Sequence, residues 1–197
     1  MISAKIEYSK KGHNDEFYTP EIAVEMILPF IPKHMTRIWE CTAIKESKIV
    51  KVLRENGYTV IPTHIKDGCD FLKFEPVDYD LNVTNPPYSI KDRFLKRAFE
   101  LGKPFMFLLP ISTLEGVGRI RMLQNNHIQL IIPDRRFSFF PGRDFGHWFQ
   151  TSWFTWGLNL GKDMNFITLN RAEVAPRNIT YSYTSIMDFY NEIRRAA

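Results

Sequence analysis

Residues 81–88 read Leu81-Asn82-Val83-Thr84-Asn85-Pro86-Pro87-Tyr88, and this segment carries the clearest structural signal in the sequence. Its first half is typical of a buried strand. The two prolines that follow fix a turn, because each ring restricts φ and neither residue has a backbone N–H. We therefore expect Asn85 and Tyr88 to enter the crevice at the carboxyl end of the strand, where open α/β sheets bind their ligands.

On either side of this segment, strand patterns alternate with helix patterns. Short apolar runs bounded by turn residues predict strands, and apolar residues at helical spacing predict helices. Such alternation predicts an α/β fold of the Rossmann-like type, with a mostly parallel sheet and helices on both faces. The expected strands are 36–40, 58–61, 79–83, 104–109 and 128–132, and the expected helices are 22–30, 49–56, 92–101 and 114–124.

The last third of the sequence changes character. Three further strands are expected at 137–140, 150–156 and 166–169, with no helix between them, and a closing helix is expected at 185–195. Strands that follow one another without a crossover helix usually pair antiparallel. We therefore predict an antiparallel hairpin at the edge of the parallel sheet.

Length and composition favour one domain. A chain of 197 residues with 44% hydrophobic residues can build one core and has little left for a second. We expect a single domain over 1–197, with 1–16 flexible. No apolar run approaches the roughly 20 residues of a membrane-spanning helix, so we predict a soluble, cytoplasmic protein without a membrane partner. Cys41 and Cys69 follow no metal-ligand spacing, and no metal site is predicted.

The charge of the chain permits a polyanionic partner without requiring one. The net charge is +4 and the pI is near 9.0. Cations gather at 91–97, at 119–121, and around the aromatic run 137–140. For the cluster at 91–97, a phosphate footprint and an ordinary solvated helix face both stay open.

The proline corner suggests a specific chemistry. An amine conjugated to an aromatic ring is a poor nucleophile, because its lone pair is delocalised. If the side-chain carbonyl of Asn85 and the backbone carbonyl of Pro86 accept its two hydrogens, the nitrogen is drawn toward tetrahedral geometry and can attack an electrophilic methyl group. The ring of Tyr88 offers a face for a planar base that has been flipped out of a helix.

The tetrapeptide 85–88 resembles the hallmark of amino-methyltransferases that use S-adenosylmethionine, a class shared by adenine-N6 DNA enzymes and glutamine-N5 protein enzymes. The overall layout is similar to that of small phage-type DNA adenine-N6 methyltransferase-like proteins. This resemblance implies a Rossmann-like methyltransferase domain and methyl transfer from S-adenosylmethionine to the N6 amine of adenine in DNA. The implied catalytic residues are Asn85, Pro86, Pro87 and Tyr88.

The same resemblance implies the residues that bind the cofactor and the DNA. The segment before the sheet would close over the cofactor, with Thr19 reaching its carboxylate. The acid that ends the first strand would begin the cofactor loop, and an acidic-aromatic pair would bracket the cofactor's adenine. These cofactor residues are Phe17, Tyr18, Thr19, Pro20, Glu40, Asp70 and Phe71. The implied target-base and DNA contacts are Phe137, Phe139, Arg135, Arg136 and Arg143, with either phenylalanine as the second wall of the base pocket.

Two departures from the family pattern concern the cofactor. The family has a glycine-rich loop after the first strand, because the cofactor lies against the backbone. Here residues 41–48 contain no glycine, and Ile44 and Glu46 stand where glycines are expected. His64 takes the place of the acid that holds the ribose hydroxyls, although Asp67 could substitute if the turn is redrawn. In the usual pose these changes predict binding weaker by several kcal/mol.

Three functions therefore stay open. The first is an active DNA adenine-N6 methyltransferase in which the loop takes another course. The second is a catalytically inactive fold kept to bind DNA or protein, for example as a phage inhibitor or decoy. The third is a protein glutamine-N5 methyltransferase. No separate target-recognition domain is expected, so sequence specificity would come from 112–121, from 142–149, or from a partner protein or second copy of the chain.

Overall fold

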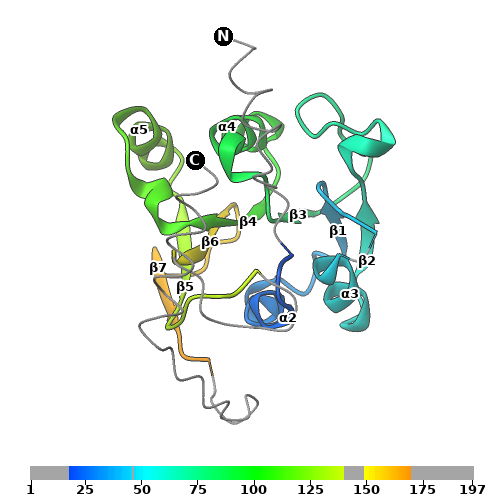
Figure 1. Ribbon diagram of the computed structural model, residues 1–197, viewed down its shortest axis with the longest axis horizontal. Helices are drawn as coiled ribbons and strands as arrows, with labels where there is room; N and C mark the ends of the chain where they lie inside the picture. Colours follow the sequence, from blue (N-terminus) through cyan, green and yellow to red (C-terminus); the bar gives the residue numbers. More distant parts are fainter. Residues whose placement is uncertain (1–17, 46, 140–148, 170–197) are drawn as a thin grey trace, which may run out of the picture.

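A computed structural model describes residues 18–45, 47–139 and 149–169 of the chain (Figure 1). The helices are α2 (Glu21–Glu25), α3 (Lys48–Glu55), α4 (Lys91–Leu101) and α5 (Val117–Asn125). The strands are β1 (Arg37–Glu40), β2 (Thr59–Pro62), β3 (Leu81–Thr84), β4 (Phe105–Pro110), β5 (Gln129–Pro133), β6 (Thr151–Trp156) and β7 (Met164–Ile167). Short 3-10 turns lie at Leu28–Phe30, Ile65–Asp67, Tyr88–Ile90 and Ile111–Leu114.

The seven strands form one sheet in the order β2-β1-β3-β4-β6-β5-β7. All neighbouring pairs are parallel except those of β6, which runs antiparallel to both β4 and β5. The predicted α/β fold of the Rossmann-like type, mostly parallel with an antiparallel component, is therefore confirmed.

The antiparallel component lies inside the sheet and not at its edge. Successive side chains of β6 enter different cores, Trp153 on one face and Phe154 on the other, and both are fully buried. β6 lies between β4 and β5, where neighbours on both sides pair with its backbone groups, and β7 takes the edge beside β5.

Helices cover both faces of the sheet. Figure 1 shows α2 and α3 on one side and α4 and α5 on the other. The alternation of side chains along β1 sends Ile38 into the core under α2 and α3 and Trp39 into the core under α4. Strands β1, β4, β5 and β6 thus contribute buried apolar side chains to both cores, which explains why β4 reads as a continuous apolar run.

Two predicted elements differ from the structure. The helix expected at 22–30 ends after Glu25 and resumes as a 3-10 turn, because Pro29 lacks the N–H that would continue the α-helical bonds. The strand expected at 137–140 is wrong over its described part: only Phe137 forms an isolated bridge, and residues 137–139 are buried without a ladder. Phe140 and the expected helix at 185–195 lie outside the described residues.

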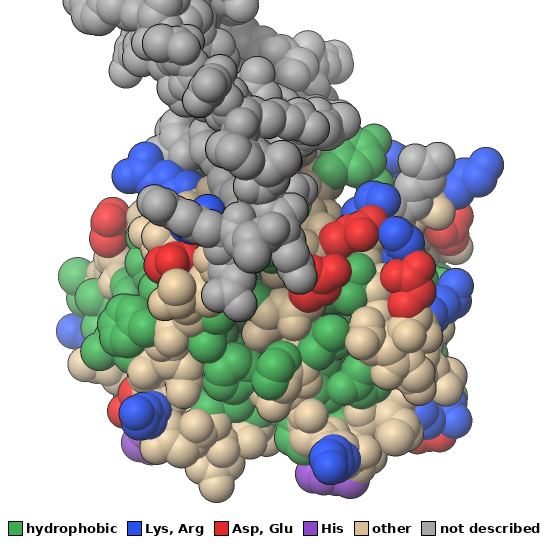
Figure 2. All heavy atoms as spheres, turned by 90° about the horizontal axis from the view of Figure 1, so that it is seen from below, with side chains coloured by type: hydrophobic (Ala, Val, Ile, Leu, Met, Phe, Trp, Pro, Cys, Tyr) green, Lys and Arg blue, Asp and Glu red, His purple; other side chains and the backbone are tan. Residues whose placement is uncertain are grey.

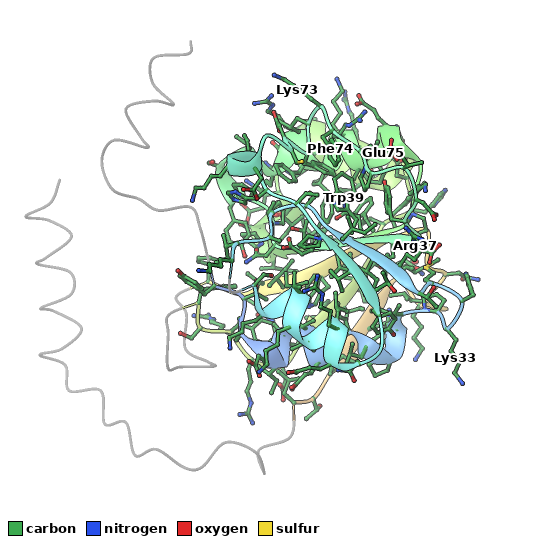
Figure 3. All side chains as sticks on the ribbon, turned by 90° about the vertical axis from the view of Figure 1, so that its right-hand side faces the viewer. Lys33, Arg37, Trp39, Lys73, Phe74 and Glu75 are labelled. Atoms are coloured by element: carbon green, nitrogen blue, oxygen red, sulfur yellow. The ribbon has the colours of Figure 1, made fainter. Side chains whose placement is uncertain are left out.

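Trp39 is the centre of a cluster of aromatic side chains. Its Nε1 donates to the Thr63 hydroxyl at 2.8 Å, and its ring lies 5.3 Å from Phe71 and 6.3 Å from Phe74. Figure 3 shows Trp39 in the interior, whereas the labelled Lys33 and Lys73 project outward from the loops. The cluster therefore fixes the segment between β2 and β3, to which Phe71 and Phe74 belong.

The face formed by α2 and α3 carries charges of both signs. Glu21 on α2 accepts from Lys48 at 2.8 Å and from Lys51 at 2.9 Å, so two lysines of α3 are held by one carboxylate. These partners, Lys48 first, lower the pKa of Glu21. Figure 2 views this side and shows cations and anions interspersed around apolar surface. Within the described residues this side is not a single-sign field of the kind that attracts a polyanion.

No helix in the ranges 18–45, 47–139 and 149–169 is long and apolar enough to cross a membrane.

Candidate active site

The strand order reverses between β1 and β3, and a pocket opens at their carboxyl ends. β1 connects to β2 on one side while β3 lies on the other, which is the topological switch point where open α/β sheets bind ligands. Glu40 ends β1 and Asn85 directly follows β3, so both reach this pocket. The lining residues are Tyr18, Thr19, Glu40, Cys41, Thr42, Ile44, Ser47, Lys48, Ile49, His64, Ile65, Asp70, Phe71, Asn85, Pro87, Ile90 and Phe94.

Glu40 lies at the bottom of the pocket and is 1% exposed. Its Oε1 accepts from the hydroxyls of Thr84 at 2.7 Å and Thr42 at 2.9 Å, and from the Thr42 N–H at 3.0 Å. Its Oε2 faces the Ser47 hydroxyl at 3.4 Å. Burial raises the pKa of Glu40 to about 7, against the opposing effect of these hydrogen bonds. The acid predicted to begin the cofactor loop is thus in the pocket, held by neutral groups.

Cys41 lies beside Glu40 and is also buried. Burial first, and then the neighbouring Glu40 carboxyl, raise the pKa of the Cys41 thiol well above its usual range. The thiol approaches Asn82 Oδ1 at 3.7 Å. Cys41 is therefore an apolar wall of the pocket and not a nucleophile.

Backbone hydrogen bonds hold the loop after Glu40, although the loop contains no glycine. Ala43 N–H donates to the Thr63 carbonyl at 2.9 Å, and Ser47 N–H donates to the Ile44 carbonyl at 3.0 Å. The Ser47 hydroxyl then caps α3 by accepting from Val50 N–H. The Ile44 side chain lines the pocket, and also an adjoining open hollow on the outer side of the loop. A side chain thus occupies space that a glycine would leave to a ligand.

His64 lies where a ribose-binding acid was expected, and it lines the pocket. Its Nδ1 accepts from Lys66 N–H at 3.1 Å. This bond uses the acceptor nitrogen of the ring, so a neutral His64 presents Nε2–H, a donor, toward a ligand. Asp67 lines the adjoining hollow instead of the pocket, so it does not replace the acid in this conformation.

The residues before α2 reach across the pocket to the proline corner. Asn85 Nδ2 donates to the Thr19 hydroxyl at 3.1 Å, and Thr19 is buried. Tyr18 lines the pocket and is 50% exposed, and Pro20 is the N-cap of α2. Phe17 lies outside the described residues. The structure therefore joins the N-terminal segment to Asn85, and the predicted contact of Thr19 with a cofactor carboxylate stays a prediction.

Asp70 and Phe71 form another wall of the pocket, as expected from the sequence. Asp70 Oδ1 accepts from Leu72 N–H at 3.0 Å, which fixes the turn. Phe71 is 2% exposed, with its ring stacked on Phe94 at 4.6 Å and tilted against Trp39 at 5.3 Å. These contacts bury most of the ring, which also lines the pocket. Covering of a ligand ring by Phe71 stays a prediction.

Tyr88 lies outside this pocket, in a group of three aromatic rings. It is 9% exposed and meets Phe139 edge-on at 6.4 Å and Phe149 edge-on at 5.8 Å, while Phe139 and Phe149 stack at 6.1 Å. Phe139 thus lies against Tyr88, and both Phe137 and Phe139 are buried in the core under α2 and α3. Access of a planar base to Tyr88 requires displacement of one of these rings.

The predicted cations differ in their surroundings. Arg135 is partly buried with its Nε 3.8 Å from Asp134, and Arg136 is exposed. Arg143 lies outside the described residues.

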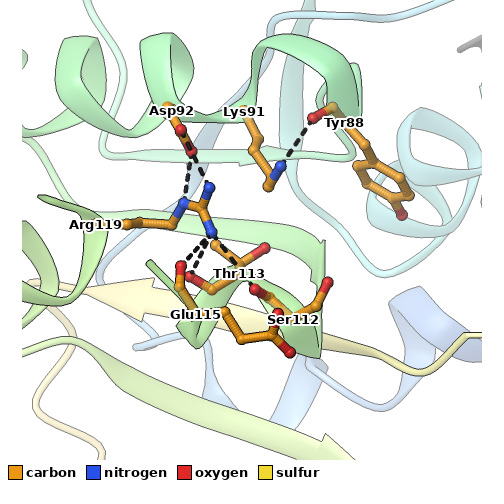
Figure 4. Close-up of polar contacts among 7 residues, drawn as sticks. All are labelled: Tyr88, Lys91, Asp92, Ser112, Thr113, Glu115 and Arg119. Atoms are coloured by element: carbon orange, nitrogen blue, oxygen red, sulfur yellow. Dashed lines mark hydrogen bonds and ion pairs between the residues drawn. The ribbon is translucent and has the colours of Figure 1, made fainter. Parts of the chain in front are cut away.

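Arg119 has a structural role: its guanidinium donates to both oxygens of Asp92, at 2.7 and 3.2 Å, and to the Glu115 carbonyl at 2.6 Å (Figure 4). These contacts join α5 to α4, and Arg119, first among the causes, lowers the pKa of Asp92.

Sequence reasoning missed the hydroxyls around Glu40 and the third aromatic ring at Tyr88. Ser47 had a local signal, since a serine before an apolar helical pattern is a typical N-cap. Thr42 and Thr84 had none, because they meet only through the parallel pairing of β1 with β3. Phe149 reaches Tyr88 from the segment that precedes β6, which no local pattern foretells.

Comparisons with known proteins give only distant similarities. No protein family and no curated protein matches the sequence. A predicted O-methyltransferase, protein Atu636 from Agrobacterium tumefaciens, superposes with a TM-score of 0.38 at 10% identity, covering 87% of this chain and 95% of that one. A protein-(glutamine-N5) methyltransferase (release factor-specific) from Alicyclobacillus acidocaldarius gives 0.38 at 17% identity, with 68% and 90% covered. A precorrin-6y C5,15-methyltransferase from Geobacter metallireducens gives 0.37 at 10% identity, with 73% and 96% covered.

Proposed function

We propose that this chain transfers a methyl group from S-adenosylmethionine to the N6 amine of adenine in DNA. The observation that carries the proposal is the position of Asn85. Its amide lines the pocket at the switch point of the sheet, its backbone leads into a double-proline corner, and Thr19 holds its Nδ2. An amide held in this way can aim Oδ1 at a substrate amine.

The pocket fits the cofactor at some positions and opposes it at others. Glu40 supplies a carboxyl group for the positively charged part of the cofactor, Asp70 supplies an acceptor for its adenine amine, and Tyr18 and Phe71 supply aromatic walls. His64 and Ile44 oppose the usual pose, since one lacks acceptors for ribose and the other fills space. When bound, S-adenosylmethionine supplies the electrophilic methyl group. Asn85 Oδ1 is buried in the ligand-free protein, so an amine reaches it only after neighbouring side chains move.

The acceptor side uses the proline corner and the aromatic rings. Asn85 Oδ1 and the Pro86 carbonyl accept the two amine hydrogens, which localises the nitrogen lone pair. The planar base takes its place against Tyr88 after Phe139 or Phe149 moves aside. Arg135 and Arg136 come directly before Phe137-Ser138-Phe139, so they are the cations that we assign to the phosphates next to a flipped base. This neighbourhood favours DNA over a protein glutamine.

The acceptor can be tested with labelled cofactor. The protein is incubated with S-adenosylmethionine carrying a labelled methyl group, together with either adenine-rich DNA or a cell extract freed of nucleic acid. Label in DNA as N6-methyladenine supports the proposal, and label in protein glutamine supports the N5 alternative. Calorimetry with S-adenosylmethionine separates both from an inactive binding module, for which no heat is expected at millimolar ligand.

Thr19 provides a test of how Asn85 is oriented. Thr19→Val keeps the shape of the side chain but removes the acceptor for Asn85 Nδ2, so the amide can rotate away from the substrate. We expect kcat for transfer to fall roughly 5- to 10-fold, the equivalent of one hydrogen bond, with KM for the cofactor nearly unchanged. Thr19→Ser retains the hydroxyl and should stay within about 2-fold. A rise in KM at constant kcat would instead assign Thr19 to the cofactor carboxylate.

His64 provides a test of cofactor affinity. His64→Asp supplies two acceptors where the present ring offers a donor, so both ribose hydroxyls gain partners. We expect the Kd for S-adenosylmethionine to fall about 10-fold, which corresponds to one or two hydrogen bonds. His64→Asn, with one acceptor oxygen, should give a smaller gain. Calorimetry on the three proteins checks this order, and unchanged affinity in His64→Asp would place the ribose elsewhere.

A further inference from the structure

The hydrogen bonds around Glu40 form a closed triangle of oxygen atoms. Thr42 Oγ1 lies 2.9 Å from Glu40 Oε1, Thr84 Oγ1 lies 2.7 Å from the same Oε1, and the two hydroxyl oxygens lie 2.6 Å apart. All three distances are those of O–H···O hydrogen bonds. Each side of the triangle therefore calls for one hydrogen.

An ionised carboxylate does not supply enough hydrogens. Thr42 and Thr84 have one hydroxyl hydrogen each, and a carboxylate has none. With Glu40 ionised, one side of the triangle would bring two oxygen lone pairs together in a buried place. With a proton on Oε1, each side has its hydrogen: Glu40 donates to Thr84, Thr84 donates to Thr42, and Thr42 donates to Glu40.

Among the residues that the structure describes, no cation pairs with Glu40. Its other contacts are the Thr42 N–H at 3.0 Å and the Ser47 hydroxyl at 3.4 Å, both neutral. The titratable side chains that face the same pocket are Tyr18 before α2, Cys41 after β1, Lys48 on α3, His64 after β2 and Asp70 before β3. Within the described residues none of them forms an ion pair with Glu40, and Lys48 directs its Nζ to Glu21 at 2.8 Å.

We propose that Glu40 carries a proton in the ligand-free protein and releases it when a positively charged ligand binds in the pocket. The first half stands on the oxygen triangle alone. The second half rests on the proposed function, since S-adenosylmethionine brings both a sulfonium and an ammonium. On release, the O–H bond of Glu40 breaks, its electron pair stays on Oε1, and the proton passes to a buffer base. The carboxylate then serves as the counter-charge of the ligand.

Burial of Glu40 favours its protonated form, as the triangle of oxygen atoms does. It raises the pKa of Glu40 to about 7, so near neutral pH the group lies close to its midpoint. A cation in the pocket favours the ionised form and lowers this pKa. Affinity for a cationic ligand should therefore rise with pH up to about 7 and level off above it, by at most about 10-fold per pH unit.

Carbon-13 NMR of protein labelled at the Glu side-chain carboxyl tests the first half without any ligand. One Glu signal should titrate with a midpoint near 7, far above the others, and it should be missing in Glu40→Gln. Glu55→Gln, at an exposed position on α3, is the control and should leave the signal with a midpoint near 7 in place. Glu40 is the one buried Glu in the described ranges, so the wild-type spectrum decides even if Glu40→Gln does not fold. Titration of every Glu signal below about pH 5.5 overturns the proposal.

Calorimetry tests the coupling. S-adenosylmethionine is titrated at pH 6.5 into wild-type protein in two buffers of different ionisation enthalpy. Release of about one half to one proton per ligand is expected, with none in Glu40→Gln. Binding without proton release overturns the coupling. If the ligand does not bind at all while one Glu titrates near 7, the proposed function fails and the protonated Glu40 stands.

Discussion

Asn85→Ala is expected to lower the rate of methyl transfer at least 100-fold, the effect of removing one well-placed polar group from a reacting centre. The alanine removes the Oδ1 that would accept from the substrate amine, so the nitrogen lone pair stays delocalised into the base. The substitution also removes the hydrogen bond to Thr19, which costs about 1 kcal/mol of stability. DNA affinity should stay largely intact, because the proposed contact of Asn85 is with the reacting amine and not with the phosphates.

Single-turnover transfer with labelled cofactor measures this effect, and gel-shift titration measures DNA affinity. Asn85→Asp is the matched control: it keeps an acceptor oxygen in the same place and should retain more activity than the alanine. Loss of transfer assigns a role to Asn85 only if the variants are folded, so unfolding curves of both variants are measured as well. Transfer by Asn85→Ala within 3-fold of wild type would remove Asn85 from the mechanism.

The part of the site that lies within one segment could be predicted from sequence. The strand at Leu81–Thr84 and the corner that follows it depend on local apolar pattern and on the restricted φ of proline. The same is true of α3, which ends where Gly57 adopts a φ of 87°. The position of Asn85 at the pocket then follows from a general property of parallel sheets, that loops at their carboxyl ends converge.

Contacts between distant segments could not be predicted in this way. Thr42 and Thr84 meet because β1 pairs with β3, and Thr19 meets Asn85 because α2 packs under the sheet. No single segment carries a signal for either contact. The role of Arg119 was hidden for the same reason: its partner Asp92 lies on another helix, and without it the arginine reads as a surface cation (Figure 4).

The position of β6 shows that tertiary packing decides where a correctly predicted strand lies in the sheet. The extended pattern of β6 was predicted, but its place in the sheet depends on what covers its two faces. Trp153 and Phe154 are both fully buried, so an edge position would leave one row of backbone groups and much apolar surface in water. Insertion between β4 and β5 avoids both costs.

The largest effect on stability is expected at Trp153. Its side chain is fully buried in the core under α2 and α3, and its Nε1 donates to the Ala23 carbonyl at 2.8 Å. Trp153→Ala leaves a large cavity and removes this donor, so we expect the free energy of unfolding to fall by about 3–5 kcal/mol. Trp153→Phe keeps most of the apolar volume and should cost about 1–3 kcal/mol, mainly through the hydrogen bond.

Denaturant unfolding of both variants measures these losses, with Trp156→Phe as control, because Trp156 is only half-buried and lies at the end of the same strand. Substitution of Trp153 should also change the position of Thr19 in the pocket. Ala23, which accepts from the indole, lies on α2, and α2 begins directly after Thr19 and Pro20. The indole therefore anchors the helix next to Thr19, which contacts Asn85. Trp153→Phe should therefore lower methyl transfer as Thr19→Val does, at conditions where the protein is still folded. Normal transfer in folded Trp153→Phe would show that the position of Thr19 does not depend on this anchor.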